Sequence, residues 1–432
     1  MSKTIKHLSL CVILLFLAVS GLNGQDKGTV RMLKANGAVG PVMSEFIIGA
    51  IEKSNDANDT ALIIELDTPG GLDTSMRAII KEMNRSKVPI VVYVSPSGAR
   101  AASAGTFITM AAHVAAMAPG TNIGAAHPVS MHGELDDTMS EKITNDFVAY
   151  IKSISDSRKR NAKWAEEAVR KSVSITNAEA LKLNVIDLVA HNRDNLLKQL
   201  NGRTVTIDNK TVTLHTSDVK ITNEEMGTRL TVLGIITDPN VAYILMMLGI
   251  WGLFFELTNP GTFFPGIIGA ISLILAFYSF QTLPVNYAGV LLIVLSLVLF
   301  ILELKFVSHG ALTIGGIISM TIGSVMLFQN ASEYYKLSLY LIAVTVLMTA
   351  GFFSIIIGLA YKAYKRKPIT GIDGLIGSKA IAKTAIGKEG MVSVRGELWS
   401  ACSDTLIEKG DDVEVTEVSG LKLKVRKISE TL

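Results

Sequence analysis

The chain has 432 residues, of which 49% are hydrophobic, and its formal net charge is only +3. A mean hydropathy of +0.40 is higher than soluble proteins usually show, which argues against a wholly soluble protein and predicts membrane segments. The weak net charge is accompanied by no long basic patch with interleaved aromatic residues, so nucleic-acid binding has little support.

The N-terminus has the three-part layout of a secretory signal peptide. Lys3 and Lys6 precede an apolar stretch at 8–19, and small or polar residues follow at 20–25. We therefore assign residues 1–24 to a signal peptide and expect the domain that follows to be exported. An uncleaved anchor is the alternative.

The cysteines limit the covalent and metal chemistry of the chain. Cys11 lies inside the apolar stretch, so only Cys402 remains once the signal peptide is removed. A single cysteine forms no intrachain disulfide and no cysteine-based metal site. We expect neither a metal nor a cofactor.

Residues 25–223 are expected to form one α/β domain. The segments 61–66 and 89–94 look like buried strands, and each is followed by a turn containing Gly or Pro and then by a helical run. This alternation predicts βαβ units with a parallel sheet. Helices are expected at 75–83 and 142–154, and a small β-hairpin is expected at 204–214.

Residues 237–362 are expected to form a transmembrane domain. Five apolar segments approach the length that a bilayer requires, at 241–257, 265–283, 287–304, 310–328 and 337–361. Glu256 and Glu303 are expected to anchor the inner ends of two of these helices. Close helix approach is expected at six glycines: Gly249, Gly252, Gly266, Gly269, Gly315 and Gly316.

The charge distribution favours five spans over four. With the N-terminal domain outside, five spans leave the basic run at 362–367 on the cytoplasmic side, as the positive-inside rule requires. The loops then placed outside, 281–286 and 329–336, carry a single Lys. We expect a multi-pass cell-membrane protein with its first domain outside or periplasmic and its last domain cytoplasmic.

Residues 371–432 are expected to form a small β-barrel. Five short segments with strand character are separated by Gly or Gly-Asp turns. Five strands in about sixty residues suggest an OB-fold. Because Trp399 is almost the only base-stacking candidate, a protein-interaction module is the better interpretation than an oligonucleotide-binding one.

Ser103 is the candidate nucleophile. It follows a Val-rich strand at 90–94 and a turn at 96–98, and it lies near the start of a helical run at 101–112. Unpaired N–H groups and the dipole at a helix start favour a developing negative charge there. The alternative is that this Ala/Ser/Gly run only allows close helix packing.

A serine nucleophile needs a base and oxyanion donors. Gly70 and Gly71 end a buried strand in a turn that can supply backbone N–H groups, although they can equally be plain turn residues. Lys142, kept neutral by burial, is one candidate base. His127 is the other, with Asp187 as a carboxylate that could orient it.

Two further histidines are weaker candidates for the base. His113 lies in an apolar helical run and is expected to be a packed or surface residue, and His132 follows in a polar stretch.

Four motifs in order resemble the NfeD family of membrane-bound serine proteases, which belongs to the Clp and signal-peptide-peptidase fold group. They are DTPGG at 67–71, SGARAASAGTFI at 97–108, MAPGTNIGAAHP at 117–128 and KITNDFVAYI at 142–151. The resemblance extends to TDPNVAY and FELTNPG in the membrane region and to the C-terminal barrel, and so covers nearly the whole chain.

This resemblance implies a crotonase/Clp-like fold and a Ser-Lys dyad. The nucleophile maps onto Ser103 and the base onto Lys142, with the N–H of Gly71 and a neighbour as oxyanion donors. Clp-type enzymes instead place a histidine about where His127 lies, so the chain holds candidates for both arrangements. The lysine is favoured because Lys-Ile-Thr-Asn matches the lysine-using family.

The resulting functional prediction is a membrane-bound serine endopeptidase. The resemblance implies that it cleaves hydrophobic segments of stomatin-like membrane proteins, and that it assembles as a homo-oligomer. The main alternative is a non-catalytic membrane scaffold for a stomatin-type partner. An acyl-CoA enzyme is disfavoured, because CoA esters are cytosolic and the domain is expected to be exported.

Overall fold

The structure is a computed structural model. It describes residues 28–129, 136–259, 261–281, 283, 285–306, 308, 310–328, 337–364 and 374–428. The expected signal peptide at 1–24 lies outside these residues. The chain divides into two compact units, residues 1–293 with 321–343 and residues 294–320 with 344–432.

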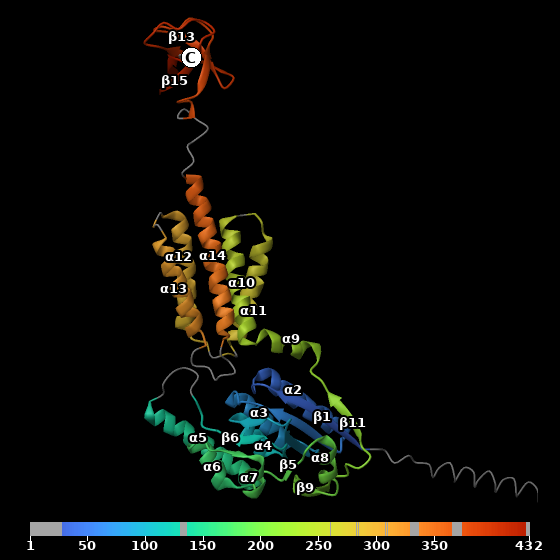
Figure 1. Ribbon diagram of the computed structural model, residues 1–432. Coiled ribbons are helices and arrows are strands. Elements are labelled where there is room, and N and C mark those ends of the chain that lie inside the picture. The colour runs from blue at the N-terminus through green and yellow to red at the C-terminus, as the bar shows by residue number, and fades with distance from the viewer. Residues whose placement is uncertain are drawn as a thin grey trace, which may run out of the picture. The chain divides into compact units, whose positions relative to one another are not determined.

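The first unit contains an α/β domain built on a six-stranded parallel sheet (Figure 1). The strand order is β11-β1-β2-β3-β5-β8, with bounds β1 (Thr29–Asn36), β2 (Ala61–Asp67), β3 (Ile90–Val94), β5 (Val114–Met117), β8 (Leu188–Val189) and β11 (Lys220–Glu224). A smaller sheet has the order β4-β6-β7, with bounds β4 (Arg100–Ala102), β6 (Asn122–Gly124) and β7 (Ser174–Thr176). The predicted hairpin is confirmed as β9 (Thr204–Ile207) and β10 (Lys210–Thr213).

Seven helices in the described part of this domain complete its layers. They are α2 (Pro41–Ala57), α3 (Asp73–Arg85), α4 (Ala104–Ala111), α5 (Asp137–Ser157), α6 (Ala162–Arg170), α7 (Asn177–Lys182) and α8 (Arg193–Leu200). The two predicted helices correspond to α3 and α5, which begin earlier and end later than their apolar patterns do.

Both faces of the main sheet are covered, which explains the continuous apolar strands. Ile64 of β2 packs into a core shared with α2 to α6, and its neighbour Ile63 packs into a second core formed with α8 and the hairpin. Both side chains are fully buried. A strand buried on two faces loses the polar alternation of a half-exposed strand, so the predicted parallel α/β class is confirmed.

The helical run expected at 101–112 is only partly correct. Residues 100–102 form strand β4, and α4 begins at Ala104. The amide of Thr68 donates to the carbonyl of Arg100 at 2.8 Å, and the amide of Ala102 donates to the carbonyl of Thr68 at 3.1 Å. This pairing outweighs the helix propensity of alanine.

The described residues of the apolar region form five helices. A short helix that the sequence pattern did not predict, α9 (Thr228–Ile236), precedes them. The five helices are α10 (Pro239–Thr258), α11 (Phe264–Phe280), α12 (Tyr287–Lys305), α13 (Ala311–Met326) and α14 (Leu339–Tyr364). Two helical stretches among the described residues, Pro239–Thr258 and Leu339–Ile356, are long and apolar enough to cross a bilayer, and three apolar helices are shorter.

Glycines bring α10 and α11 into backbone contact. A Cβ added at Gly252 would lie 2.4 Å from the carbonyl oxygen of Pro265 and 2.7 Å from Cα of Gly269. Added atoms at Gly249, Gly266 and Gly316 would also clash with a neighbouring helix. At Gly315 the nearest atom is 3.6 Å away, which is ordinary contact. Close approach is therefore confirmed at five of the six predicted glycines, and wrong for Gly315.

Glu303 binds the start of the helix that follows its own, and the anchoring of inner span ends by Glu256 and Glu303 stays a prediction. Its carboxylate accepts hydrogen bonds from the amides of Gly310 and Thr313, each at 3.0 Å, and from the hydroxyl of Ser308 at 2.6 Å. The carboxylate thus satisfies N–H groups that the first turn of α13 leaves without an intrahelical partner.

The second unit contains the C-terminal barrel. Its strands are β12 (Lys379–Ala382), β13 (Gly390–Val394), β14 (Glu397–Cys402), β15 (Asp412–Ser419) and β16 (Lys422–Lys427), and they close in the order β12-β13-β14-β16-β15. Alternate residues such as Val392 and Val394 are fully buried inside it. The predicted five-stranded barrel is confirmed.

The α10–α11 contact makes a stability prediction. We expect Gly252→Ala to lower the free energy of unfolding by about 1–3 kcal/mol, because the two helices must separate to admit a methyl group. Gly351→Ala is the matched control, since an added Cβ in that part of α14 meets nothing within 4 Å. The measurement is unfolding of the full chain in detergent micelles, and equal stabilities of the two variants would contradict the prediction.

Candidate active site

Ser103 lies in a constrained turn between β4 and α4. Its backbone has φ 52° and ψ −117°, a conformation that costs a non-glycine residue about 1–3 kcal/mol. Its amide donates to the carbonyl of Gly124 at 3.0 Å. The buried hydroxyl of Thr106 donates to Ala101 and to the same Gly124 carbonyl, both at 2.9 Å. These bonds hold the serine in place at the start of the helix.

Gly70 lies directly beside Ser103. It has φ +123°, and a Cβ added there would lie 2.5 Å from Cβ of Ser103. Its amide donates to Oγ1 of Thr68 at 3.1 Å, so this N–H already has an acceptor. The N–H groups of Gly71 and Ala104, by contrast, have no acceptor among the residues that the structure describes. The turn therefore offers one of the two predicted glycine amides, together with the first amide of α4.

A cavity of about 670 Å³ connects the predicted site residues. Ser103, Gly71, His127 and Lys142 all line it, although they come from four separate segments of the chain. Apolar side chains make up much of the rest of the wall: Leu72, Met76, Val129, Met139, Ile143 and Phe147. This volume is typical of a ligand-binding cleft.

Lys142 reaches the cavity from the second turn of α5. The side chain is exposed, which differs from the expectation that burial keeps its amine neutral. The buried residues of α5 begin only at Val148, so the first turns of the helix have little covering them. Neither the amine of Lys142 nor the hydroxyl of Ser103 forms a hydrogen bond with another described residue.

His127 is oriented by a backbone carbonyl and not by a carboxylate. Its Nδ1 lies 2.9 Å from the carbonyl oxygen of Val169. Since a carbonyl only accepts, Nδ1 carries the proton of the neutral ring and Nε2 is left as the acceptor.

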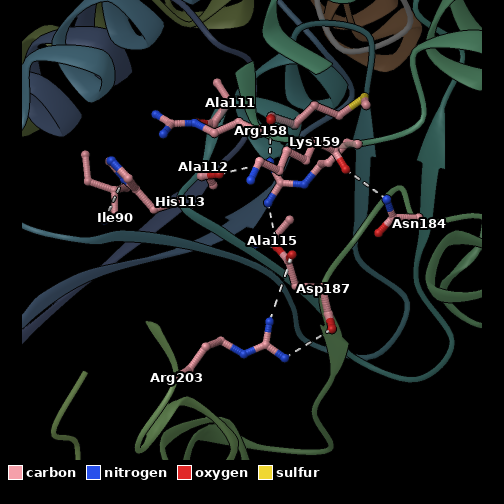
Figure 2. A network of polar contacts seen from close by, with 12 residues as sticks. Ile90, Ala111, Ala112, His113, Ala115, Arg158, Lys159, Asn184, Asp187 and Arg203 are labelled. Carbon is pink, nitrogen blue, oxygen red and sulfur yellow. Dashed lines mark hydrogen bonds and ion pairs between the residues drawn. The ribbon is translucent and has the colours of Figure 1, made fainter. Parts of the chain in front are cut away.

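The expectation that Asp187 orients His127 is wrong. The carboxylate of Asp187 accepts from Arg160 at 2.5 Å and from the amide of Ala115 at 2.7 Å. Arg203 lies 3.9 Å from the same carboxylate, and Figure 2 shows Arg203 facing Asp187. Arg160 also donates to the carbonyls of Met110 and Ala112 at the end of α4. Asp187 thus supports the C-terminal end of the helix that begins beside Ser103.

His113 is a packed residue, as predicted. Its Nδ1 accepts from the amide of Ile90 at 3.1 Å, a contact visible in Figure 2. Burial, followed by the charges of Arg158 and Arg160, lowers the pKa of His113 to about 3. The ring is therefore neutral at physiological pH. His132 lies outside the described residues.

Within the described ranges, no group of three or more His, Cys, Asp or Glu side chains is arranged to hold a metal ion.

Comparison with known proteins shows the family. Three family models match consecutive regions: the NfeD1b N-terminal domain over 29–223, the NfeD integral membrane domain over 240–359, and the NfeD-like C-terminal, partner-binding domain over 372–427. Membrane-bound protease PH1510 of Pyrococcus horikoshii is 38% identical over 428 residues, which are 96% of each chain. The chain belongs to the NfeD family.

A second relative also carries the NfeD name. Membrane protein NfeD1b of Bacillus subtilis is 25% identical over 450 residues, covering 96% of this chain and 97% of that protein. The predicted succession of an α/β domain, an apolar helical region and a five-stranded barrel is confirmed. Since a protease is related to this NfeD chain over nearly its whole length, the chain is a membrane protease.

Solved structures of the N-terminal region are also similar. The 1510-N membrane protease specific for a stomatin homolog from Pyrococcus horikoshii is 37% identical, with a TM-score of 0.44, and the match covers 49% of this chain and all of that one. A lysine-to-alanine mutant of the 1510-N stomatin-specific protease, solved with a substrate peptide, is 37% identical with a TM-score of 0.46. That match covers 49% of this chain and 99% of that one.

Thr106 and Arg77 contribute to the site and were not predicted from the sequence. Thr106 fixes the Ser103 turn, and the available signal was its position in the predicted helical run shortly after Ser103. Arg77 binds both Asp73 and Asp146, which line the cavity. The spacing of Asp73 and Arg77 on one helix was a visible signal, whereas nothing in the sequence connects Arg77 to Asp146.

The low pKa of His113 predicts a pH-dependent stability. Between pH about 6.5 and about 3 the unfolded chain binds a proton that the folded ring does not bind. The free energy of unfolding should therefore fall as the pH falls through this window, by up to about 1.4 kcal/mol per pH unit from this residue. His113→Asn keeps an acceptor for Ile90 and should show a smaller fall.

The measurement is the melting temperature of the full chain in detergent at about pH 7.5 and about pH 5 for both proteins. All other titrating groups are shared, so the difference between the two falls isolates His113. Equal falls would contradict the assignment.

Proposed function

We propose that this chain is a serine endopeptidase with a Ser103–Lys142 dyad. The observation that carries the proposal is that Ser103, held in a strained turn at a helix start, lines one cavity with Lys142 and Gly71. Strain of this kind is characteristic of functional residues.

The reaction follows from these positions. Neutral Lys142 accepts the proton of the Ser103 hydroxyl while Oγ attacks the scissile carbonyl, and the resulting ammonium returns that proton to the leaving amine. Lys142 then takes a proton from water, whose oxygen attacks the acyl-enzyme ester, and the ammonium returns this proton to Oγ of Ser103 as the ester bond breaks. A substrate that fills the apolar cavity would exclude water around the amine and favour its neutral form.

The oxyanion is assigned to the amides of Gly71 and Ala104. Gly71 was predicted, and Ala104 replaces Gly70, whose N–H is already bonded to Thr68. An amide at the first position of α4 also adds the favourable potential of the helix N-terminus to a developing negative charge.

His127 remains the alternative base. Its ring is fixed by the carbonyl of Val169, and it lines the same cavity. No described carboxylate orients the ring and stabilises its charged form, as a Ser-His-Asp arrangement requires. Lys142 is therefore the assignment we favour.

The substrate class is proposed from the cavity wall and the relatives. A wall of Leu, Met, Val, Ile and Phe side chains suits an apolar peptide segment. Related solved proteins are described as specific for a stomatin homolog. We infer that this chain cleaves hydrophobic segments of stomatin-like membrane proteins. Assembly into a homo-oligomer stays a prediction.

The domain boundaries and topology are also proposed. Residues 25–223 would form the protease domain, 237–362 a five-span membrane domain and 371–432 the C-terminal domain. The family-model matches and the five apolar helices support this division. The protease domain would lie outside or in the periplasm, and the barrel in the cytoplasm.

The dyad makes a direct prediction. Ser103→Ala and Lys142→Ala should each lower kcat/KM by about 10³-fold or more, whereas His127→Ala should stay within about tenfold of wild type. Lys152→Ala is the matched control, because this lysine lies on the same helix and binds Glu166 away from the cavity. The assay is cleavage of a fluorescence-quenched peptide with an apolar stretch by the full chain in detergent.

Loss in Ser103→Ala and His127→Ala, with Lys142→Ala active, would replace the dyad by a Clp-like mechanism. No cleavage by any folded form would favour the non-catalytic scaffold for a stomatin-type partner. The scaffold hypothesis has its own support, because the family model that matches residues 372–427 is described as a partner-binding domain.

The topology predicts that the two ends of the chain lie on opposite sides of the membrane. In intact cells whose outer surface is accessible, an added protease should remove a tag placed after the signal peptide and spare a tag at the C-terminus. Digestion of both tags would indicate an even number of spans and contradict the five-span assignment.

A further inference from the structure

Arg77 joins the two helices that border the cavity on one side. From α3, its Nε donates to Asp73 at 2.8 Å, and its Nη2 donates to Asp146 of α5 at 2.5 Å. The guanidinium also lies 4.3 Å from the centroid of the Tyr150 ring and 5.6 Å from that of Phe147. One side chain therefore makes two ion pairs and two cation–π contacts, three of these four with α5.

The aromatic contacts extend to the nucleophile's helix. Phe107 of α4 packs edge-on against Phe147 at 5.6 Å and stacks on Tyr150 at 6.0 Å. The α5 face that Arg77 holds is thus also packed on α4, whose first residue follows Ser103. Burial lowers the pKa of Arg77, but its bonds to Asp73 and Asp146 outweigh burial and raise it above the ordinary value. The guanidinium keeps its charge throughout the working pH range.

Asp146 lies one helical turn after Lys142. Residues four apart on a helix share a face, and both of these side chains line the cavity. A carboxylate close to an ammonium favours the protonated amine, which cannot accept a proton from serine. An unpartnered Asp146 would therefore oppose the role of Lys142 as a base.

The titratable groups that line the cavity with Lys142 come from α3, from α5 and from the segment after β6. Two carboxylates in the described part of the chain line it, Asp73 and Asp146, and both bind Arg77. His127 faces it from the segment after β6, and Glu141 is the exposed neighbour on α5.

The remaining packed elements add no charge to the cavity wall. Helix α4 carries no titratable side chain. From α6, Glu166 binds Lys152 and Arg170, and no residue of α6 lines the cavity. Arg77 is therefore the group that neutralises the two described carboxylates that line the cavity with Lys142.

We propose that Arg77 is a positioning residue for Lys142, which holds α5 in place and keeps Asp73 and Asp146 from pairing with the catalytic amine. The inference rests on the proposed role of Lys142 as the base. Loss of Arg77 frees two carboxylates to pair with the ammonium, so proton removal requires a higher pH. The effect is thus on the pH dependence of catalysis as well as on its maximum.

The test is the pH profile of kcat/KM for the full chain in detergent, with the fluorescence-quenched apolar peptide as substrate. Arg77→Gln should move the acid limb to higher pH by about one unit or more, which is about a tenfold loss below the midpoint. The double variant Arg77→Gln/Asp146→Asn loses the same Arg77 packing contacts but has one carboxylate fewer. Its acid limb should therefore lie closer to that of the wild type than the acid limb of Arg77→Gln does. Arg77→Lys keeps the positive charge but cannot bind both carboxylates in a fork, so its acid limb should shift by an intermediate amount. It also provides a second test if Arg77→Gln does not fold.

A loss in Arg77→Gln by the same factor at every pH would overturn the inference, since a purely structural role predicts it. A double variant that keeps the full shift would overturn it as well. The proposed function fails separately, through an active Lys142→Ala protein. An inactive Lys142→Ala protein with an unshifted Arg77→Gln limb would leave the dyad in place and remove only the role of Arg77.

Discussion

The contact between Gly70 and Ser103 is the constraint on which the site depends. Ser103 adopts a backbone conformation that is unfavourable for an L-residue, and the turn after β2 passes so close to it that Gly70 cannot be replaced by a residue with a side chain. The hydrogen bonds of Thr68 with Arg100 and Ala102 hold the two segments in register, and Thr106 bonds the Ser103 segment to Gly124. The unfavourable backbone energy of one residue is thus offset by the pairing of several others.

Charged and polar groups are arranged at both ends of α4. At the start of α4, the amide of Ala104 follows Ser103 and lines the same cavity as Gly71. At the C-terminal end, Arg158 and Arg160 bind the last carbonyls of the helix. Positive groups at the end of a helix stabilise it through its dipole and satisfy carbonyls that lack intrahelical partners. Asp187, bound to Arg160, therefore contributes to the site from the far end of the helix.

Features that depend on local pattern could be predicted from the sequence, and features that depend on distant partners could not. The strands at 61–66 and 89–94 were visible because burial on both faces gives continuous apolar runs. Strand β4 was not, since Arg-Ala-Ala has no strand preference and is ordered by Thr68 and β6. The contact between Arg77 and Asp146 joins residues 69 positions apart, so no spacing rule reveals it.

Closure of the C-terminal barrel limits how that domain can recognise another protein. Strands β12 and β15 pair antiparallel and complete the ring. An open sheet presents unpaired backbone groups at its edges, to which an extended peptide of almost any sequence can add as a further strand. A closed ring offers no such edge. Recognition by this domain must therefore depend on side chains and loops of its outer surface, which makes it sensitive to the identity of the bound sequence and resistant to edge-to-edge aggregation.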